Sequence, residues 1–173
     1  MKQSGEQQTR FDALLEKHKG ILIKIAGTYA FNPEDRNDLV QEISFQLWKA
    51  FPKYDASRPF STWVYRIALN VGISFSRRSS FQDGRSISLE NMPVEPTDPN
   101  SDLPQGERIQ WLQRFLSRID ELNRALMILY LEEYSYQEIA EILGITETNV
   151  ATKISRLKQR IRSEFDETDS QQN

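Results

Sequence analysis

The side chains of this chain that are best suited to chemistry lie between Val150 and Arg162, and the chemistry is contact with nucleic acid. This stretch carries five basic residues and no acidic residue. If Val150 faces the inside of a helix, the residues that face outward are Thr148, Thr152, Ser155, Arg156 and Gln159. Short hydrogen-bonding side chains together with Arg can read base edges in a major groove, while neighbouring Lys and Arg bind phosphates. The alternative is a solvated basic helix face.

The residues around this stretch predict how it is positioned. Ser135 with Glu138 is a capping box, which begins a short helix. Gly144 stands where a helix C-cap requires a left-handed residue. Thr146 then caps a longer helix, and its inward residues are Val150, Ile154, Leu157 and Ile161. A short helix, a glycine turn and a longer helix form the helix-turn-helix plan.

The composition argues against an enzyme. The chain has 0 Cys and 1 His, which excludes thiol nucleophiles, disulfides, thiolate zinc sites and His-rich metal sites. The paired carboxylates of Glu132 and Glu133 are adjacent on a helix and do not face each other. We therefore expect no catalytic residue, no metal, no cofactor and no small-molecule substrate. The sequence has no apolar run of about 20 residues and no signal peptide, which predicts a cytoplasmic protein without membrane insertion.

Charge divides the chain into four stretches. Residues 1–89 have 13 basic and 9 acidic residues, and residues 108–162 have 9 basic and 7 acidic residues. Between them, residues 90–107 have five acids and no base, and residues 90–106 hold four of the seven prolines. Such a strip buries too little apolar surface to fold alone. We therefore predict an all-α protein of two small helical domains: a flexible N-terminus 1–10, a first domain 11–82, an extended acidic Pro-rich linker 83–106, a second domain 107–163 and an acidic disordered tail 164–173.

Three main helices are expected in the first domain. Apolar residues recur at helical spacing from Phe11 to Tyr29. Asn32-Pro33 supplies an N-cap and a first-turn proline, so a second helix should begin near Glu34 and end before Pro52. A third helix should run from about residue 60 to 78, with an inward stripe of Phe60, Val64, Ile67, Val71 and Phe75.

The second of these helices carries large side chains on two sides. Leu39, Ile43, Leu47 and Ala50 share one side, and Gln41, Phe45 and Trp48 lie opposite, flanked by Asp38 and Glu42. Two aromatic residues on the face that a monomer leaves polar indicate a docking surface. The alternative is that another helix of the same domain covers them.

Three motifs in this order resemble the extracytoplasmic-function (ECF) group of bacterial RNA polymerase sigma factors, in the sigma-70 family. DLVQEISFQLW (residues 38–48) is similar to the helix that binds the clamp helices of the largest polymerase subunit. PFSTWVYRIALNV (59–71) resembles the helix that melts and reads the −10 element, and YQEIAEILGITETNVATKISRLK (136–158) resembles the −35-reading helix-turn-helix. The resemblance covers roughly residues 11–80 and 107–162.

The resemblance implies three sets of site residues. The polymerase contacts are Asp38, Leu39, Gln41, Glu42, Phe45 and Trp48. The −10 contacts are Tyr54, Asp55, Ser57, Arg58, Ser61, Trp63, Arg66, Asn70 and Arg77. The first four belong to the specificity loop of residues 52–59, which in this family receives a base flipped out of the DNA. The −35 contacts are Thr148, Asn149, Thr152, Lys153, Ser155, Arg156 and Gln159. Tyr54 could instead be a packing anchor of the loop, and Trp63 could instead be a core residue.

The implied function is recognition of promoters and initiation of transcription, with core RNA polymerase and promoter DNA as partners. Many members are also held by an anti-sigma factor. The linker either threads toward the polymerase cleft or is a simple tether. The recognition helix departs from the common pattern, with Thr148-Asn149 before Val150 and Ala151 after it, so the −35 bases that it reads are left open. The alternative is a stand-alone helix-turn-helix regulator that binds DNA without polymerase, which the motif at residues 38–48 disfavours.

Overall fold

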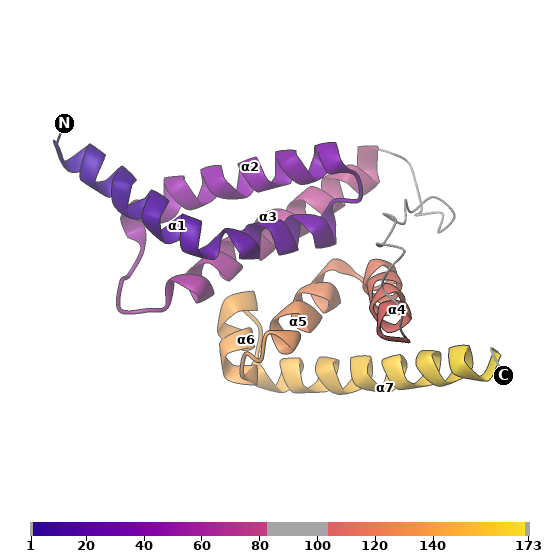
Figure 1. Cartoon of the computed structure of the whole chain (residues 1–173). Helices are drawn as coiled ribbons and strands as arrows, with labels where there is room; N and C mark the ends of the chain where they lie inside the picture. The colour runs from indigo at the N-terminus through magenta and orange to yellow at the C-terminus, as the bar shows by residue number, and fades with distance from the viewer. Residues whose placement is uncertain (1, 83–103, 172–173) are drawn as a thin grey trace. The chain divides into compact units, whose positions relative to one another are not determined.

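The chain folds into helices, as the sequence predicts (Figure 1). The structure is a computed structural model, and it describes residues 2–82 and 104–171. The chain divides into two compact units, residues 1–95 and 96–173. Most of the predicted linker, residues 83–103, lies outside the described residues. Within the described ranges, no helix is both long and apolar enough to cross a membrane.

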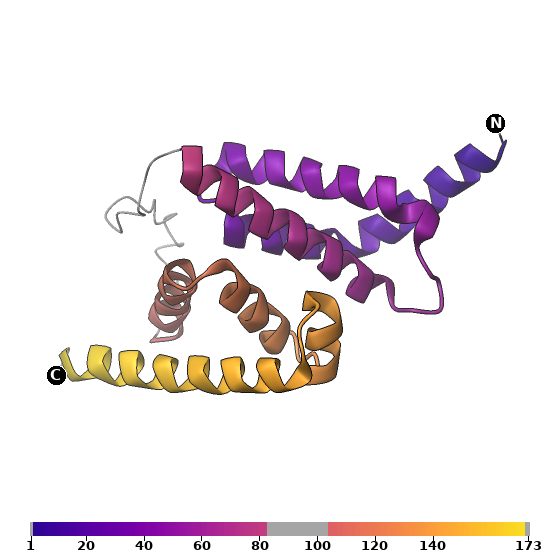
Figure 2. The ribbon, with the colours of Figure 1, turned by 180° about the vertical axis from the view of Figure 1, so that it is seen from behind.

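The first unit is a bundle of three helices, α1 (Lys2–Tyr29), α2 (Pro33–Ala50) and α3 (Phe60–Gln82), each packed against the other two (Figures 1 and 2). A short 3-10 helix, η1 (Phe51–Lys53), follows α2. The predicted start of α2 is confirmed, because the Asn32 side chain accepts a hydrogen bond from the Asp35 backbone N–H at 2.8 Å and Pro33 stands in the first turn. This cap fixes the residue at which α2 begins after α1 ends.

The ends of the chain differ from the sequence-based expectation. Residues 2–10 were expected to be flexible, but α1 already begins at Lys2. No proline interrupts this segment, and Thr9 donates a hydrogen bond to the Gly5 carbonyl at 2.9 Å. Residues 164–173 were expected to be disordered, but α7 (Glu147–Gln171) continues through most of them. Both segments extend a neighbouring helix, so they need no nucleation of their own.

The inward stripe of α3 also differs from the expectation. Val64, Tyr65, Ala68 and Leu69 are buried, whereas the expected core residues Ile67, Val71 and Phe75 are only half-buried. The reason is close approach of α1 to α3 at Gly72. A Cβ atom on Gly72 would lie 2.8 Å from the Tyr29 ring, so small residues occupy the side of α3 that faces α1.

Gly72→Ala is expected to lower the free energy of unfolding by about 1–3 kcal/mol, because the added methyl collides with the Tyr29 ring. Alanine is otherwise favoured over glycine within a helix by about 1 kcal/mol, so the collision must outweigh this gain. Urea unfolding measures the change. Gly27→Ala is the matched control, because nothing lies within 4 Å of a Cβ there and the variant should be slightly more stable. A Gly72→Ala protein as stable as wild type would show that α1 and α3 are not in close contact.

The second unit contains α4 (Pro104–Arg118), α5 (Glu121–Leu131), α6 (Tyr136–Leu143) and α7. The predicted capping box is confirmed: Glu138 accepts from the Ser135 N–H at 2.8 Å, and Ser135 accepts from the Glu138 N–H at 3.2 Å. Gly144 has φ 69° and ψ 34°, the left-handed conformation that only glycine adopts at low cost. Thr146 accepts from the Asn149 N–H at 3.1 Å, as a cap of α7. The α6–α7 pair is therefore the predicted helix-turn-helix.

A buried arginine joins α4 to α5. The Arg124 side chain is only 3% exposed. Its Nε donates to the Leu116 carbonyl at 2.8 Å, and its Nη2 donates to the Ser117 and Ile119 carbonyls at 3.3 and 3.1 Å. These carbonyls belong to the end of α4, where no further turn satisfies them. Arg124 thus caps α4 from the neighbouring helix.

Candidate nucleic-acid and partner interfaces

The outer face of α2 presents an exposed aromatic ring. The Phe45 side chain is 58% exposed, and Asp38 and Gln41 are also exposed, while Glu42 is half-buried. Among the described residues, only Ile23 and Leu131 are large apolar residues of comparable exposure. No helix of the first unit covers Phe45. The expectation that this side of α2 is open is confirmed for Phe45.

Two residues expected on the same face are completely or partly buried. Leu39 is completely buried with Ile43 and Leu47, so it stabilises the bundle and cannot contact a partner. Trp48 is half-buried, with its ring 5.2 Å from the Phe11 ring between centroids. Leu39 belongs to the inward stripe of α2, which the 100° rotation per residue separates from Gln41. The open face of α2 is therefore formed by Asp38, Gln41, Glu42, Phe45 and one part of Trp48.

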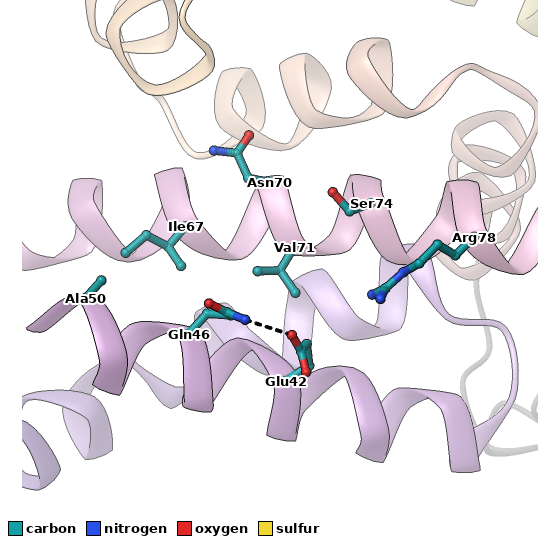
Figure 3. A pocket seen from close by; sticks show the side chains of 8 residues that line it. All are labelled: Glu42, Gln46, Ala50, Ile67, Asn70, Val71, Ser74 and Arg78. Carbon is teal, nitrogen blue, oxygen red and sulfur yellow. Dashed lines mark hydrogen bonds between the residues drawn. The ribbon is translucent and has the colours of Figure 1, made fainter.

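A groove of about 540 Å³ runs between α2 and α3 (Figure 3). Its lining residues are Glu42, Gln46, Ala50, Ile67, Asn70, Val71, Ser74 and Arg78. Gln46 donates a hydrogen bond to the Glu42 carboxylate at 3.0 Å, which fixes that carboxylate at the edge of the groove. The expected polymerase contact Glu42 and the expected −10 contact Asn70 thus lie along one groove.

The Tyr54 side chain packs against aromatic rings of the loop between α2 and α3 and of the start of α3. Its ring lies 5.0 Å from the Trp63 ring and 5.3 Å from the Phe60 ring, between centroids. Its hydroxyl donates to the Arg58 carbonyl at 2.7 Å and so closes the loop. The structure therefore favours the alternative given above for Tyr54. The ring packs the loop against the start of α3, and the residues that follow Tyr54 form the exposed tip of the loop.

The tip of this loop is an ordered, charged turn. Asp55 accepts a hydrogen bond from the Ser57 backbone N–H at 2.9 Å. Hydrogen bonds from Ser57 hold the pKa of the Asp55 carboxyl below its usual value of 3.8. Asp55, Ser57 and Arg58 are all exposed. The turn therefore holds the Asp55 carboxylate in place through Ser57 and presents it to solvent beside the exposed Arg58 side chain.

The residues of α3 predicted to face DNA are either exposed or half-buried, and none is completely buried. Arg66, Asn70 and Arg77 are exposed, as expected for residues without a core role. Ser61 and Trp63 are half-buried. The Trp63 ring packs against Tyr54 and also against Phe60, and the Trp63 and Phe60 ring centroids lie 5.3 Å apart. Trp63 thus joins the aromatic cluster of the loop while leaving part of its ring accessible.

The outward face of α7 agrees with its sequence pattern. Val150, Ile154 and Leu157 are buried. The exposed residues are Thr148, Asn149, Thr152, Ser155, Arg156 and Gln159, and Lys153 is half-buried. This burial confirms the predicted orientation of the helix. A continuous strip of short polar side chains and Arg is therefore presented to the outside by a rigid helix.

Not every basic residue of α7 is equally available to a ligand. The Lys158 ammonium lies 4.6 Å from the centre of the Tyr130 ring, and its hydrogen bond with Tyr130 raises the pKa of the lysine. Arg160 forms an ion pair with Glu164 at 2.6 Å. Arg156 and Arg162 are exposed and form no ion pair with any residue that the structure describes. They are the cations of α7 best placed to meet phosphates.

The helical bundle with an open face on α2 and the helix-turn-helix together define a DNA-binding factor of transcription initiation. The family Sigma-70 region 2 matches residues 14–82, and the family Sigma-70 region 4 matches residues 109–161. The chain belongs to the sigma-70 family, in its extracytoplasmic-function group. It is a sigma factor that directs RNA polymerase to promoters.

Two sigma factors are similar in sequence to this chain over nearly its whole length. The ECF RNA polymerase sigma factor SigW of Bacillus subtilis is 27% identical over 170 residues, which cover 91% of this chain and 90% of SigW. The ECF RNA polymerase sigma-E factor of Escherichia coli K12 is 27% identical over 169 residues, which cover 92% of this chain and 87% of that protein.

Solved structures share the fold. The sigma factor RpoE of Bartonella quintana, solved with the anti-sigma factor NepR, superposes with a TM-score of 0.72 at 21% identity, covering 89% of this chain and 95% of that one. CnrH, solved with the cytosolic domain of CnrY, gives a TM-score of 0.63 at 21% identity, covering 92% of this chain and 89% of that one.

Proposed function

We propose that the chain recruits core RNA polymerase through the open face of α2 and reads promoter DNA through two further surfaces, one in each unit. The exposed ring of Phe45 carries this proposal, because a regulator that binds DNA without polymerase has no need of an aromatic side chain there. Asp38, Gln41 and Glu42 around it supply polar contacts at the rim, and the accessible part of Trp48 enlarges the apolar centre.

The first unit would read the −10 element with the loop tip and α3. Asp55, Ser57 and Arg58 would receive a flipped base, which costs a few kcal/mol of stacking that contacts in the loop must offset. Arg66, Asn70 and Arg77 would bind the separated strand along α3. Ser61 and the accessible part of Trp63 lie at the start of α3, where duplex would meet open strand. Tyr54 acts by holding the loop in place.

The second unit would read the −35 element in the major groove. Thr148, Asn149, Thr152, Ser155 and Gln159 are the base-contacting candidates, because their short polar side chains face outward. Arg156 and Lys153 flank them, where they would bind base edges or the phosphate backbone. Thr152 donates to the Thr148 carbonyl of its own helix at 3.0 Å, which leaves its hydroxyl oxygen to accept.

Each unit carries a small surface, so each would bind DNA weakly by itself. Polymerase would hold both units on one DNA molecule, which turns the second contact into an intramolecular one and strengthens the pair. The polymerase supplies the chemistry of RNA synthesis, so we propose no catalytic residue, metal or cofactor for this chain. We place the protein in the cytoplasm, where its polymerase partner works.

We also propose regulation by an anti-sigma factor. Two proteins of similar fold support the proposal. RpoE was solved with the anti-sigma factor NepR, and CnrH was solved with the cytosolic domain of CnrY. Such a partner would act by covering the open face of α2 or the outward face of α7. It would then compete directly with polymerase or promoter.

Run-off transcription with purified core polymerase on a library of promoter fragments tests the proposal. Transcripts should require both the chain and core polymerase. Arg156→Ala should lower the affinity of the reconstituted holoenzyme for a selected promoter about tenfold, because a base or phosphate contact is lost. Arg114→Ala on α4 is the matched control, and it should leave the affinity unchanged. A chain that never binds polymerase, yet occupies specific DNA sites by itself, would establish the stand-alone regulator instead.

A further inference from the structure

One carboxylate in the second unit binds two arginines from two helices. The Glu164 carboxylate of α7 accepts from Nη2 of Arg118, at the end of α4, at 3.0 Å. Its other oxygen accepts from Nε of Arg160 at 2.6 Å. Two guanidinium groups that converge on one anion are the arrangement with which proteins bind phosphate.

Both guanidinium groups are held in place by contacts other than Glu164. The Arg118 Nε donates to the Arg114 carbonyl of its own helix at 3.3 Å. The Arg160 guanidinium lies 5.4 Å from the centre of the Phe115 ring, which is completely buried. Phe115 in turn stacks on Trp111, with centroids 5.5 Å apart. The pair of arginines would therefore keep its geometry if another anion replaced the carboxylate.

The position of Arg160 connects this pair to the outward face of α7. Lys153, Arg156 and Arg160 follow one another at intervals of three and four residues, so they share one edge of the helix. Arg156 on that edge is exposed and is proposed above to contact DNA. A phosphate backbone that passes Arg156 along this edge would next meet Arg160.

The ion pairs themselves are weak, because their side chains are partly exposed to water. The Arg118, Arg160 and Glu164 side chains are 37%, 49% and 25% exposed. Exposed ion pairs contribute little to stability. The packing of α4 on α7 is provided instead by the aromatic rings, including Trp111 against Phe165 with centroids 5.4 Å apart. Replacing the carboxylate by a DNA phosphate would thus cost the fold little.

We propose that Arg118 and Arg160 form a second phosphate-binding site for duplex DNA, and that Glu164 occupies the position of the phosphate in the free protein. Binding of DNA would exchange the carboxylate for a backbone phosphate and add one contact beyond Arg156. The inference rests on the proposed binding of duplex DNA by α7. It gives Glu164 a regulatory effect, since the carboxylate lowers the affinity of the free protein for DNA of any sequence.

Fluorescence anisotropy with the full-length chain and a labelled duplex of arbitrary sequence tests this site. Glu164→Gln removes the competing charge, so the affinity should rise about threefold to tenfold at about 50 mM salt. The slope of log affinity against log salt should steepen by about 1, because in the wild-type chain the displaced carboxylate takes up a salt cation and so offsets the counterion that the phosphate releases. Glu133→Gln removes the same charge from an exposed residue without an ion pair among the described residues, and it should change the affinity less than twofold.

A second pair of variants distinguishes a phosphate-binding site from an ion pair that only stabilises the fold. Arg160→Gln should lower the affinity of the wild-type chain about threefold, and Glu164→Gln combined with Arg160→Gln should lose the gain of the single variant. Unchanged affinity in both Glu164→Gln and Arg160→Gln would overturn the inference. If Arg156→Ala still weakens binding in that case, the proposed −35 surface stands and only this site is refuted. A wild-type chain that binds no duplex at low salt would overturn both.

Discussion

Phe45→Ala is expected to weaken binding of the chain to core RNA polymerase about 30-fold, while the free energy of unfolding stays the same. The ring is 58% exposed in the free protein, so its removal leaves no cavity in the bundle. An aromatic ring at the centre of an interface typically contributes at least about 2 kcal/mol, which corresponds to that loss of affinity. A titration of labelled chain with core polymerase measures the change.

Ile23→Ala provides the control for Phe45→Ala. Ile23 is 61% exposed and lies in the same unit, but on α1 rather than on α2. Its truncation removes similar exposed apolar surface, and polymerase should bind the variant as it binds wild type. Equal affinities of both variants and wild type would show that polymerase does not use this face of α2. Trp48 is a poorer probe, because its ring also packs against Phe11.

Arg124→Met is expected to destabilise the second unit by about 3–5 kcal/mol. Methionine fills most of the space but leaves the Leu116, Ser117 and Ile119 carbonyls without their charged donor. Hydrogen bonds to a charged group contribute about 1.5–3 kcal/mol each, and orphaned buried carbonyls add a desolvation cost. The end of α4 should separate from α5 first, because Arg124 is the link between them.

Urea unfolding followed by hydrogen exchange measures this loss helix by helix. Exchange should accelerate in α4 and α5 and remain unchanged in the bundle of the first unit. Arg114→Met is the matched control, because Arg114 is exposed and its Nε reaches only the Gln110 carbonyl of its own helix, at 3.4 Å. An Arg124→Met protein as stable as this control would mean that the three carbonyls find other donors.

Features that depend on a few neighbouring residues were predictable from the sequence. The Asn32-Pro33 start of α2, the Ser135–Glu138 capping box and the left-handed Gly144 each follow from local backbone chemistry. The outward face of α7 followed from its periodicity, because a single stripe of β-branched and leucine residues faces the core. Local rules suffice where the neighbours along the chain supply the interactions.

Features that depend on another helix were not predictable in this way. The pattern of α3 favoured the larger residues Ile67 and Val71, but α1 comes so close that the buried side includes Ala68 and Gly72. Hydrophobic periodicity weights large side chains, whereas close helix packing selects small ones. Arg124 gave no sequence signal either, since a buried arginine looks like any surface arginine until its carbonyl partners are known.

In the candidate site too, some features follow from local sequence and others depend on contacts between distant residues. Exposure of Phe45, Arg66, Asn70 and Arg156 follows from their helix faces alone. The roles of Tyr54 and Trp63 depend on ring contacts across the loop, which spacing cannot reveal. The pairing of Arg118 with Glu164 joins residues 46 positions apart, so no local pattern indicated it.

In the loop between α2 and α3, the residue that packs the loop against the bundle differs from the residues that form its exposed tip. The Tyr54 ring and hydroxyl hold the loop against Phe60, Trp63 and the Arg58 carbonyl, while the Asp55, Ser57 and Arg58 side chains extend into solvent. Exchanges at the tip therefore leave the helices undisturbed. If the tip reads the −10 element as proposed, substitutions of Asp55, Ser57 and Arg58 would change the promoters that the protein selects, and exchanging the tip between relatives would transfer that choice.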